Sequence, residues 1–257
     1  MNSEWLSISV NLAILAALVC SLWLNLRFIA SRRANRAASG QVPPCPLTVG
    51  DLLIFAALTA ATLTVRSPLL LALMVTAGAA LLYRRRDALG YWRFKLSETG
   101  AYLRDGLRGY LTVLLPLTLI VLPVSLLCER LGVDFTQPVI GLFLDLHSPL
   151  KITLFILTAV IVAPLWEEIV FRGVLYPWLK KYLPARWAML LSSSAWAASH
   201  LHWPALLPFT FLGCALCFFY EQTGRLGVTV ALHAIFNLTT VLLLLLLNHH
   251  GNWPPPY

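Results

Sequence analysis

Long apolar runs recur along this sequence, each separated from the next by a short stretch that holds Lys, Arg, Gly or Pro. A helix needs about 20 mostly apolar residues to cross the hydrocarbon core of a bilayer. Only 12% of the residues are charged and 59% are apolar, too few charges to cover a water-facing surface. The sequence therefore predicts an all-α, polytopic helical membrane protein with about eight transmembrane helices, at Leu6–Leu26, Leu47–Val65, Leu69–Tyr83, Tyr110–Cys128, Ile152–Leu179, Trp187–Trp203, Ala205–Tyr220 and Leu226–Leu247.

The net charge of +8 is explained by where the basic residues lie. If each span reverses the side of the membrane, 15 of the 19 Lys and Arg fall on one side. Positive loops of this kind mark the cytoplasmic face. The basic residues form no aromatic-interleaved stripe, so nucleic acid is not an expected partner. We expect an integral, multi-pass protein of a bacterial cytoplasmic membrane, with its basic loops in the cytoplasm and membrane lipid around it.

The five cysteines do not indicate a disulfide framework, because their number is odd and four lie in or at the end of apolar runs. Cys214 and Cys217 form a CxxC pair, but the surrounding small residues favour close helix packing over redox or metal chemistry.

Three charged residues lie inside a single predicted span: Glu167, Glu168 and Arg172. Each costs at least about 2.5 kcal/mol to bury at membrane depth, so their presence needs a reason. Glu168 and Arg172 are four residues apart and can pair along one helix face. In ordinary helical geometry Glu167 is rotated by about 100° from Glu168, which leaves one carboxylate without that partner. Such a carboxylate is a candidate general base or acid.

Polar side chains on two further spans match this depth. Glu167 lies 13 residues from Lys180 and His200 lies 14 residues from Arg186, so both are about 20 Å from the basic side. His233 and Asn237 share one face of the last span, at about 12 and 18 Å. Each also has a structural interpretation: an ion pair for Glu168 and Arg172, a packed histidine for His200, and an interhelical clamp for His233 with Asn237. Packing alone does not require all of them at one depth.

These residues carry a family resemblance. Residues 167–172 match EExxxR, residues 196–200 resemble FxxxH, and residues 233–237 match HxxxN, in that order and on separate spans. The set resembles the CPBP family, the intramembrane proteases related to CAAX prenyl protease 2 and also called Abi proteins. The likeness covers about Ile152 to Leu247. Trp196 stands where the pattern has Phe, which we expect to alter the shape of the pocket more than its chemistry.

The resemblance implies an intramembrane endopeptidase that cleaves near the C-terminus or a membrane segment of a protein or peptide substrate. Glu167 would activate water with help from His200, while Glu168 and Arg172 would hold the site together. His233 and Asn237 would steady the oxyanion. No metal or other cofactor is certain; zinc is possible, and Glu167, His200 and His233 would then be its ligands. HExxH is absent from the sequence, and we favour the metal-free alternative.

The resemblance also suggests a division of the chain. Residues 1–151 hold the N-terminal transmembrane helices with an interfacial segment near 87–108, residues 152–247 form the CPBP-like catalytic core, and residues 248–257 form a loose tail. Two other functions fit the same composition: a proton-coupled membrane transporter and a non-catalytic membrane scaffold. We find no inverted repeat with paired broken spans, which a transporter built from two halves would show.

Overall fold

The fold is all-helical throughout the residues that the structure, a computed structural model, describes: 3–34, 42–43, 45, 47–64 and 94–249. No strand occurs in these segments. The elements are α1 (Ser3–Ala34), α2 (Val49–Thr64), η1 (Leu96–Glu98), α5 (Thr99–Arg130), α6 (Pro138–Leu144), α7 (Pro149–Leu157), η2 (Thr158–Val162), α8 (Ala163–Glu167), η3 (Glu168–Leu175), α9 (Tyr176–Leu179), α10 (Ala185–Ser199), η4 (Trp203–Ala205), α11 (Leu206–Thr223) and α12 (Leu226–His249).

Five described helical stretches are long and apolar enough to cross a membrane: Ser9–Arg27, Leu96–Arg130, Pro149–Leu179, Trp203–Thr223 and Leu226–Leu246. They confirm a polytopic α-helical membrane protein. Two further predicted spans correspond to α2 and α10, which have only 16 and 15 residues. The span predicted at 69–83 lies outside the described residues, so the number eight stays a prediction.

Several predicted boundaries shift in the structure. In the described part of the segment expected at the membrane surface near 87–108, η1 spans Leu96–Glu98 and α5 begins at Thr99 and continues to Arg130, so the interfacial position stays a prediction. The sixth span ends at Ser199 rather than Trp203. The tail expected from residue 248 starts inside α12, which extends to His249, and residues 250–257 lie outside the described ones.

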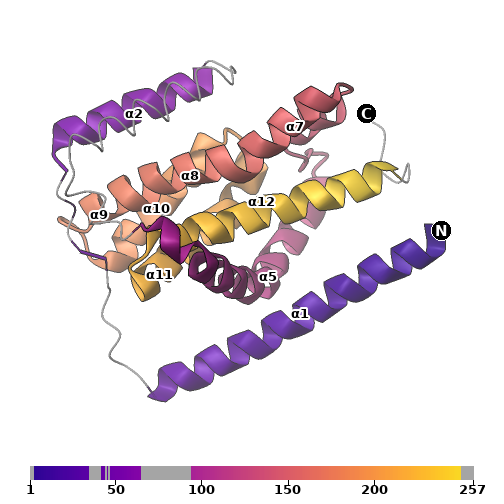
Figure 1. Ribbon diagram of the computed structural model, residues 1–257, viewed down its shortest axis with the longest axis horizontal. Helices are drawn as coiled ribbons and strands as arrows, with labels where there is room; N and C mark the ends of the chain where they lie inside the picture. Colours follow the sequence, from indigo (N-terminus) through magenta and orange to yellow (C-terminus); the bar gives the residue numbers. More distant parts are fainter. Residues whose placement is uncertain (1–2, 35–41, 44, 46, 65–93, 250–257) are drawn as a thin grey trace.

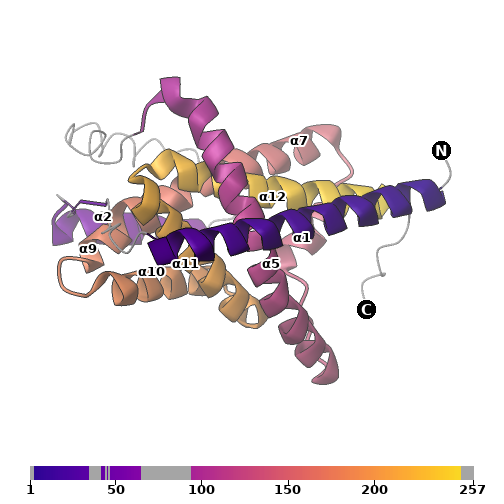
Figure 2. The ribbon, with the colours of Figure 1, turned by 90° about the horizontal axis from the view of Figure 1, so that it is seen from below.

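The C-terminal helices form the packed part of the bundle. Helix α12 lies beside η2 and α8 and also packs on α5, which crosses the bundle obliquely (Figures 1 and 2). Helices α10 and α11 form an antiparallel pair. The main hydrophobic core joins η3, α9, α10, α11 and α12 and includes Val174, Trp196, Leu216 and Leu232.

Two π-helical turns interrupt the long helix from Pro149 to Leu179, and each ends two residues before a proline. Segment η2 precedes Pro164, and η3 precedes Pro177. In η2 the Ala163 N–H bonds to Thr158 O, five residues back. The next bond in this register would need an N–H at Pro164, which proline lacks, so Ala159 O has no backbone donor in that register. Asn237 on α12 donates its Nδ2 to this oxygen at 2.8 Å.

Proline shapes the α1–α5 contact in the same way. Pro116 in α5 cannot donate to Thr112 O. On α1, Asn25 Nδ2 donates to Thr112 O at 2.8 Å and Ser21 Oγ donates to it at 3.3 Å. Ser21 Oγ also accepts from Leu115 N at 2.9 Å. Since hydrocarbon offers no donor, these side chains satisfy the carbonyl that the proline leaves unpaired.

The basic loops meet at one end of the bundle. Lys180 Nζ donates to Val42 O at 3.2 Å and Lys181 Nζ donates to Leu47 O at 3.1 Å, which joins the segment before α2 to the end of the helical stretch Pro149–Leu179. Arg225 lies 3.6 Å from a carboxylate oxygen of Glu98. The loop charges assigned these segments to one side of the membrane, and their contacts agree with that assignment.

The five cysteines are free thiols, as expected. Cys217 is buried in α11, where its Sγ lies 3.8 Å from Ser193 Oγ of α10. This position agrees with a packing role. In the segment before α2, burial raises the pKa of the Cys45 thiol.

Replacing Asn25 by Leu should lower the free energy of unfolding by about 1 kcal/mol, because Thr112 O loses an interhelical donor. In a Pro116→Ala background the backbone N–H of residue 116 can bond to that oxygen, so the same change should cost less. Unfolding by SDS in mixed micelles measures both losses. Equal losses in the two backgrounds would show that Asn25 does not compensate for the proline.

Candidate active site

Five of the six predicted site residues come together from three helical stretches. Glu167 ends α8, and Glu168 and Arg172 lie in η3. His200 caps the C-terminus of α10, and His233 lies in α12. The predicted match in depth between Glu167 and His200 therefore holds in three dimensions.

Glu168 and Arg172 form a buried ion pair. Arg172 Nη1 lies 2.9 Å from Glu168 Oε1, and both side chains are 0% exposed. The turn containing them is π-helical and not the ordinary α-helix assumed from the sequence. Arg172 Nη2 also donates to Gly213 O of α11 at 3.3 Å. A Cβ on Gly213 would lie 2.7 Å from Ser193 Cβ, so glycine allows α10 and α11 to approach each other at the site.

Both histidines have their Nδ1 atoms engaged. His233 Nδ1 lies 2.9 Å from Glu168 Oε1, and His200 Nδ1 lies 2.8 Å from Trp196 O. A carboxylate and a carbonyl can only accept, so each Nδ1 carries the hydrogen. In this tautomer each Nε2 presents a lone pair.

Both Nε2 atoms face the same oxygen of Glu167. Glu167 Oε2 lies 4.0 Å from His200 Nε2 and 3.9 Å from His233 Nε2. These distances are too long for a direct hydrogen bond and suit a bridging water. The Glu167 and His200 side chains are 25% and 26% exposed, whereas that of His233 is 4% exposed. The site is therefore open on the side of Glu167 and His200.

Asn237 lies apart from this group. Its hydrogen bond to Ala159 O joins α12 to η2, two helical turns before Glu167. In the structure it clamps two helices next to the site. The oxyanion role implied by the family resemblance stays a prediction.

Trp196 is the residue whose contribution the sequence analysis missed. Its Nε1 donates to Glu167 Oε2 at 2.6 Å, so the exchange of Phe for Trp adds a hydrogen-bond donor as well as volume. The sequence contained the signal for this contact, because the Trp indole carries an N–H that the Phe ring of the family pattern lacks.

Leu201 follows His200 with φ +52°, in the left-handed region. This conformation costs a residue with a Cβ about 1 kcal/mol. It ends α10 at His200 and directs the chain into η4, with the Leu201 side chain 77% exposed. No glycine or asparagine at this position announces the turn, so the sequence did not show where α10 ends.

The site lies toward the end of the bundle opposite the basic loops. Two residues beyond His200, His202 Nε2 lies 3.1 Å from Phe135 O in the loop after α5. In that loop, hydrogen bonds from Thr136 lower the pKa of Asp134. The contact places His200 next to the predicted outer loops.

The donor atoms match zinc in type but not in spacing. Glu167, His200 and His233 offer oxygen and nitrogen donors, and the Nδ1 partners are those that metal-bound histidines use. Tetrahedral zinc holds donors about 3.4 Å apart, less than the 3.9 and 4.0 Å seen here. Trp196 already donates to Glu167 Oε2. No group of three metal-binding side chains that could hold an ion is found within the described segments.

Comparison with known proteins assigns this region to a family. Residues 149–239 match the family model described as "Type II CAAX prenyl endopeptidase Rce1-like". We call the matching residues 149–239 the Rce1-like domain. All six predicted site residues lie within this Rce1-like domain, which confirms the resemblance drawn from the motifs.

A curated relative matches about a third of the chain. The Bacillus subtilis (strain 168) protein named "Putative membrane peptidase YdiL" is 31% identical over 92 residues. The match covers 36% of this chain and 38% of that relative, so it spans little more than a third of either protein. No solved structure matches significantly. Helices α1, α2 and α5 precede the residues that match the family model.

Replacing Arg172 by Met should lower the free energy of unfolding by about 3–5 kcal/mol, since it leaves the Glu168 carboxylate buried without its cation. The double variant Glu168→Gln/Arg172→Met should recover part of this loss. SDS unfolding in mixed micelles provides the comparison. A double variant that is less stable than Arg172→Met would contradict a charge-balancing role for Arg172.

Proposed function

We propose that this protein is an intramembrane endopeptidase in which Glu167 activates a water molecule to cleave a peptide bond. The observation that carries this proposal is the convergence of Glu167 Oε2 with the Nε2 atoms of His200 and His233. The Rce1-like domain supports the same class of reaction.

Electrostatics determine what can lie between these three atoms. A carboxylate oxygen and two neutral Nε2 atoms all present lone pairs, because both Nδ1 atoms carry the hydrogen. Three acceptors around one point repel each other unless hydrogens or a cation lie between them. A water molecule supplies two hydrogens and also provides the nucleophile that peptide hydrolysis needs.

The reaction follows from this placement. Glu167 takes a proton from the water as its oxygen attacks the carbonyl carbon of the substrate. His200, beside Glu167 on the open side, shares the water's hydrogens. The C–N bond then breaks as the proton held by Glu167 passes to the leaving nitrogen, which yields a carboxylic acid and an amine. His233 Nε2, which faces the same oxygen of Glu167, accepts a hydrogen bond from the second hydrogen of the water during the attack.

The surrounding residues keep these groups in place. Arg172 balances the charge of Glu168, and Glu168 in turn holds His233 through Nδ1. Asn237 holds α12 against η2, and α12 carries His233. We assign Asn237 this positioning role, and any contact with the oxyanion would be additional.

We also propose that the basic end of the bundle faces the cytoplasm of a bacterial cell, with lipid around the helices. The site then opens beyond the middle of the bilayer, toward the outer loops near Phe135 and His202. A protein or peptide substrate with a cleavable bond near its C-terminus or in a membrane segment could reach Glu167 from that side.

No step is assigned to a metal, because the spacing around Glu167 Oε2 exceeds that of zinc ligands. We therefore expect EDTA and phenanthroline to leave the cleavage rate of the purified protein unchanged. Elemental analysis of the same preparation should find less than one zinc per chain. Loss of activity on chelation, restored by Zn²⁺, would replace this mechanism with a zinc-dependent one.

Glu167→Gln should lower the rate of cleavage by at least about 100-fold, since the amide cannot take the proton from water. Glu129→Gln, at an exposed position on α5, is the matched control and should retain full activity. Comparative proteomics of membranes from cells with either variant identifies the substrate. Its cleavage produces a new peptide terminus with Glu129→Gln, and this terminus is absent with Glu167→Gln. Unchanged cleavage in that variant would exclude this mechanism, and lost ion uptake without any cleavage would favour a transporter.

A further inference from the structure

The geometry points to Trp196 as a positioning residue that holds Glu167 Oε2 between the two histidines through its indole N–H. This inference rests on the proposed function and adds a residue to its machinery. From the motif alone, Trp196 is expected only to alter the shape of the pocket.

The contact is short and involves a charged partner. Trp196 Nε1 donates to Glu167 Oε2 at 2.6 Å. This oxygen is also the atom that lies 4.0 and 3.9 Å from the two Nε2 atoms. A hydrogen bond to a carboxylate is about twice as strong as one between neutral groups. The indole therefore restrains the oxygen that faces the water.

Trp196 is itself held on several sides. It is 1% exposed, and the Arg172 guanidinium lies 4.7 Å from its ring centroid. The rings of His200 and His233 meet it at 79° and 89°, with centroids 4.9 and 5.4 Å away. Phe209 of α11 lies 5.7 Å away. A donor so tightly packed has little freedom to follow Glu167 if that side chain turns.

The same contacts connect Glu167 to the buried ion pair. Arg172 pairs with Glu168 and also lies over the indole that bonds to Glu167. Glu167 and Glu168 face different partners, and Trp196 links the two groups. Phenylalanine could fill the same space and meet the same rings, but it has no N–H to give to a carboxylate.

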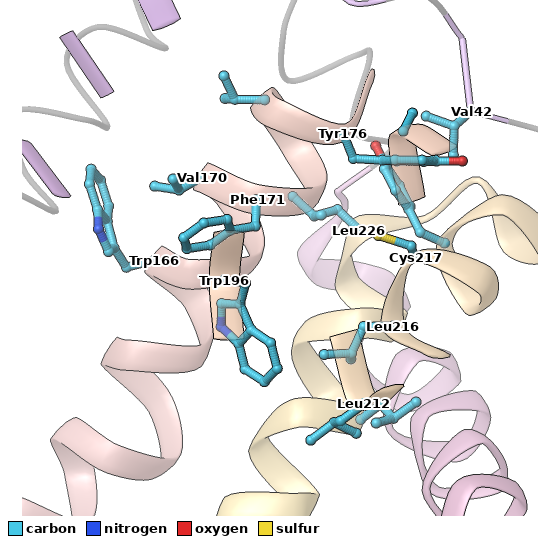
Figure 3. Close-up of a cluster of buried hydrophobic side chains, with 14 of the residues drawn as sticks. Val42, Trp166, Val170, Phe171, Tyr176, Trp196, Leu212, Leu216, Cys217 and Leu226 are labelled. Carbon is cyan, nitrogen blue, oxygen red and sulfur yellow. The ribbon is translucent and has the colours of Figure 1, made fainter. Parts of the chain in front are cut away.

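The second buried indole of this region provides a control. Trp166 precedes Glu167 and is 4% exposed. Figure 3 shows Trp166 on the other side of its helix, pointing away from Trp196, while Trp196 lies between the segment of Phe171 and the helix of Leu216. The change Trp166→Phe removes a comparable indole beside Glu167 without touching its carboxylate contact.

The test uses the full-length protein in detergent with a cleaved substrate. Trp196→Phe keeps an aromatic ring and removes the N–H. Replacing Trp196 by benzothienylalanine, in which sulfur stands in place of the indole N–H, keeps the ring system and its packing. Both variants should lower kcat by about 10- to 100-fold, the range for a hydrogen bond to a charged group, and leave KM within about twofold.

The assignment would be overturned by unchanged kcat in both variants, by a rise in KM alone, or by an equal fall of kcat in Trp166→Phe. The benzothienylalanine variant separates the hydrogen bond from packing, so a poorly folded Trp196→Phe protein does not decide the outcome. Full activity of benzothienylalanine beside an inactive Trp196→Phe would show that packing alone matters.

A spectroscopic measurement tests the contact without cleavage. With ¹⁵N-labelled indoles, the Trp196 N–H proton, assigned by its loss in Trp196→Phe, should resonate downfield and move upfield in Glu167→Gln. An unmoved resonance would contradict the hydrogen bond. If the native protein cleaves no substrate but the Trp196 N–H resonance moves in Glu167→Gln, the proposed function fails and the hydrogen bond from Trp196 to Glu167 stands. If it cleaves normally with benzothienylalanine, the positioning role fails and the proposed function stands.

Discussion

The buried pair of Glu168 and Arg172 is the interaction on which the site depends. Two full charges at 0% exposure in an apolar bundle are tolerated only if each is compensated. Arg172 compensates Glu168, its Nη2 donates to Gly213 O, and its guanidinium lies over the ring of Trp196. Glu168 in turn holds His233. One ion pair thus connects η3 to α10, α11 and α12 and fixes the orientation of side chains that lie beside the more exposed Glu167.

The backbone N–H groups that prolines lack organise the packing of other helices. Pro164 leaves Ala159 O without a donor in the π-helical register, and Asn237 supplies one from α12. Pro116 leaves Thr112 O without its ordinary donor, and Asn25 supplies one from α1. In hydrocarbon an unpaired carbonyl costs several kcal/mol, so each proline creates a specific demand that one side chain on a neighbouring helix meets. These polar contacts select which helices pack together, where apolar surfaces alone would leave the choice open.

The candidate site was largely predictable because charge is scarce in the chain. Glu167, Glu168 and Arg172 stand out inside one apolar run, and helical rise alone brings His200 level with Glu167. Other features had visible signals that ordinary helical geometry obscured: Pro164 and Pro177 mark the two π-helical turns. The end of α10 had none, because Leu201 adopts a left-handed conformation that its residue type does not favour. The expected count of eight spans depends partly on residues that the structure leaves undescribed, and α2 and α10 are short.

The sequence by itself determined the all-α membrane fold, and it predicted the sidedness of the basic loops and the candidate site residues, since these follow from hydropathy, charge placement and spacing along single helices. Only the tertiary structure decided which atoms meet. The Nδ1 partner of His233 is Glu168 on another helix, and this contact sets which nitrogen of His233 faces Glu167. The donor to Glu167 comes from Trp196, 29 positions further along the chain. Such contacts depend on how helices pack side by side, and no periodicity within one helix encodes them.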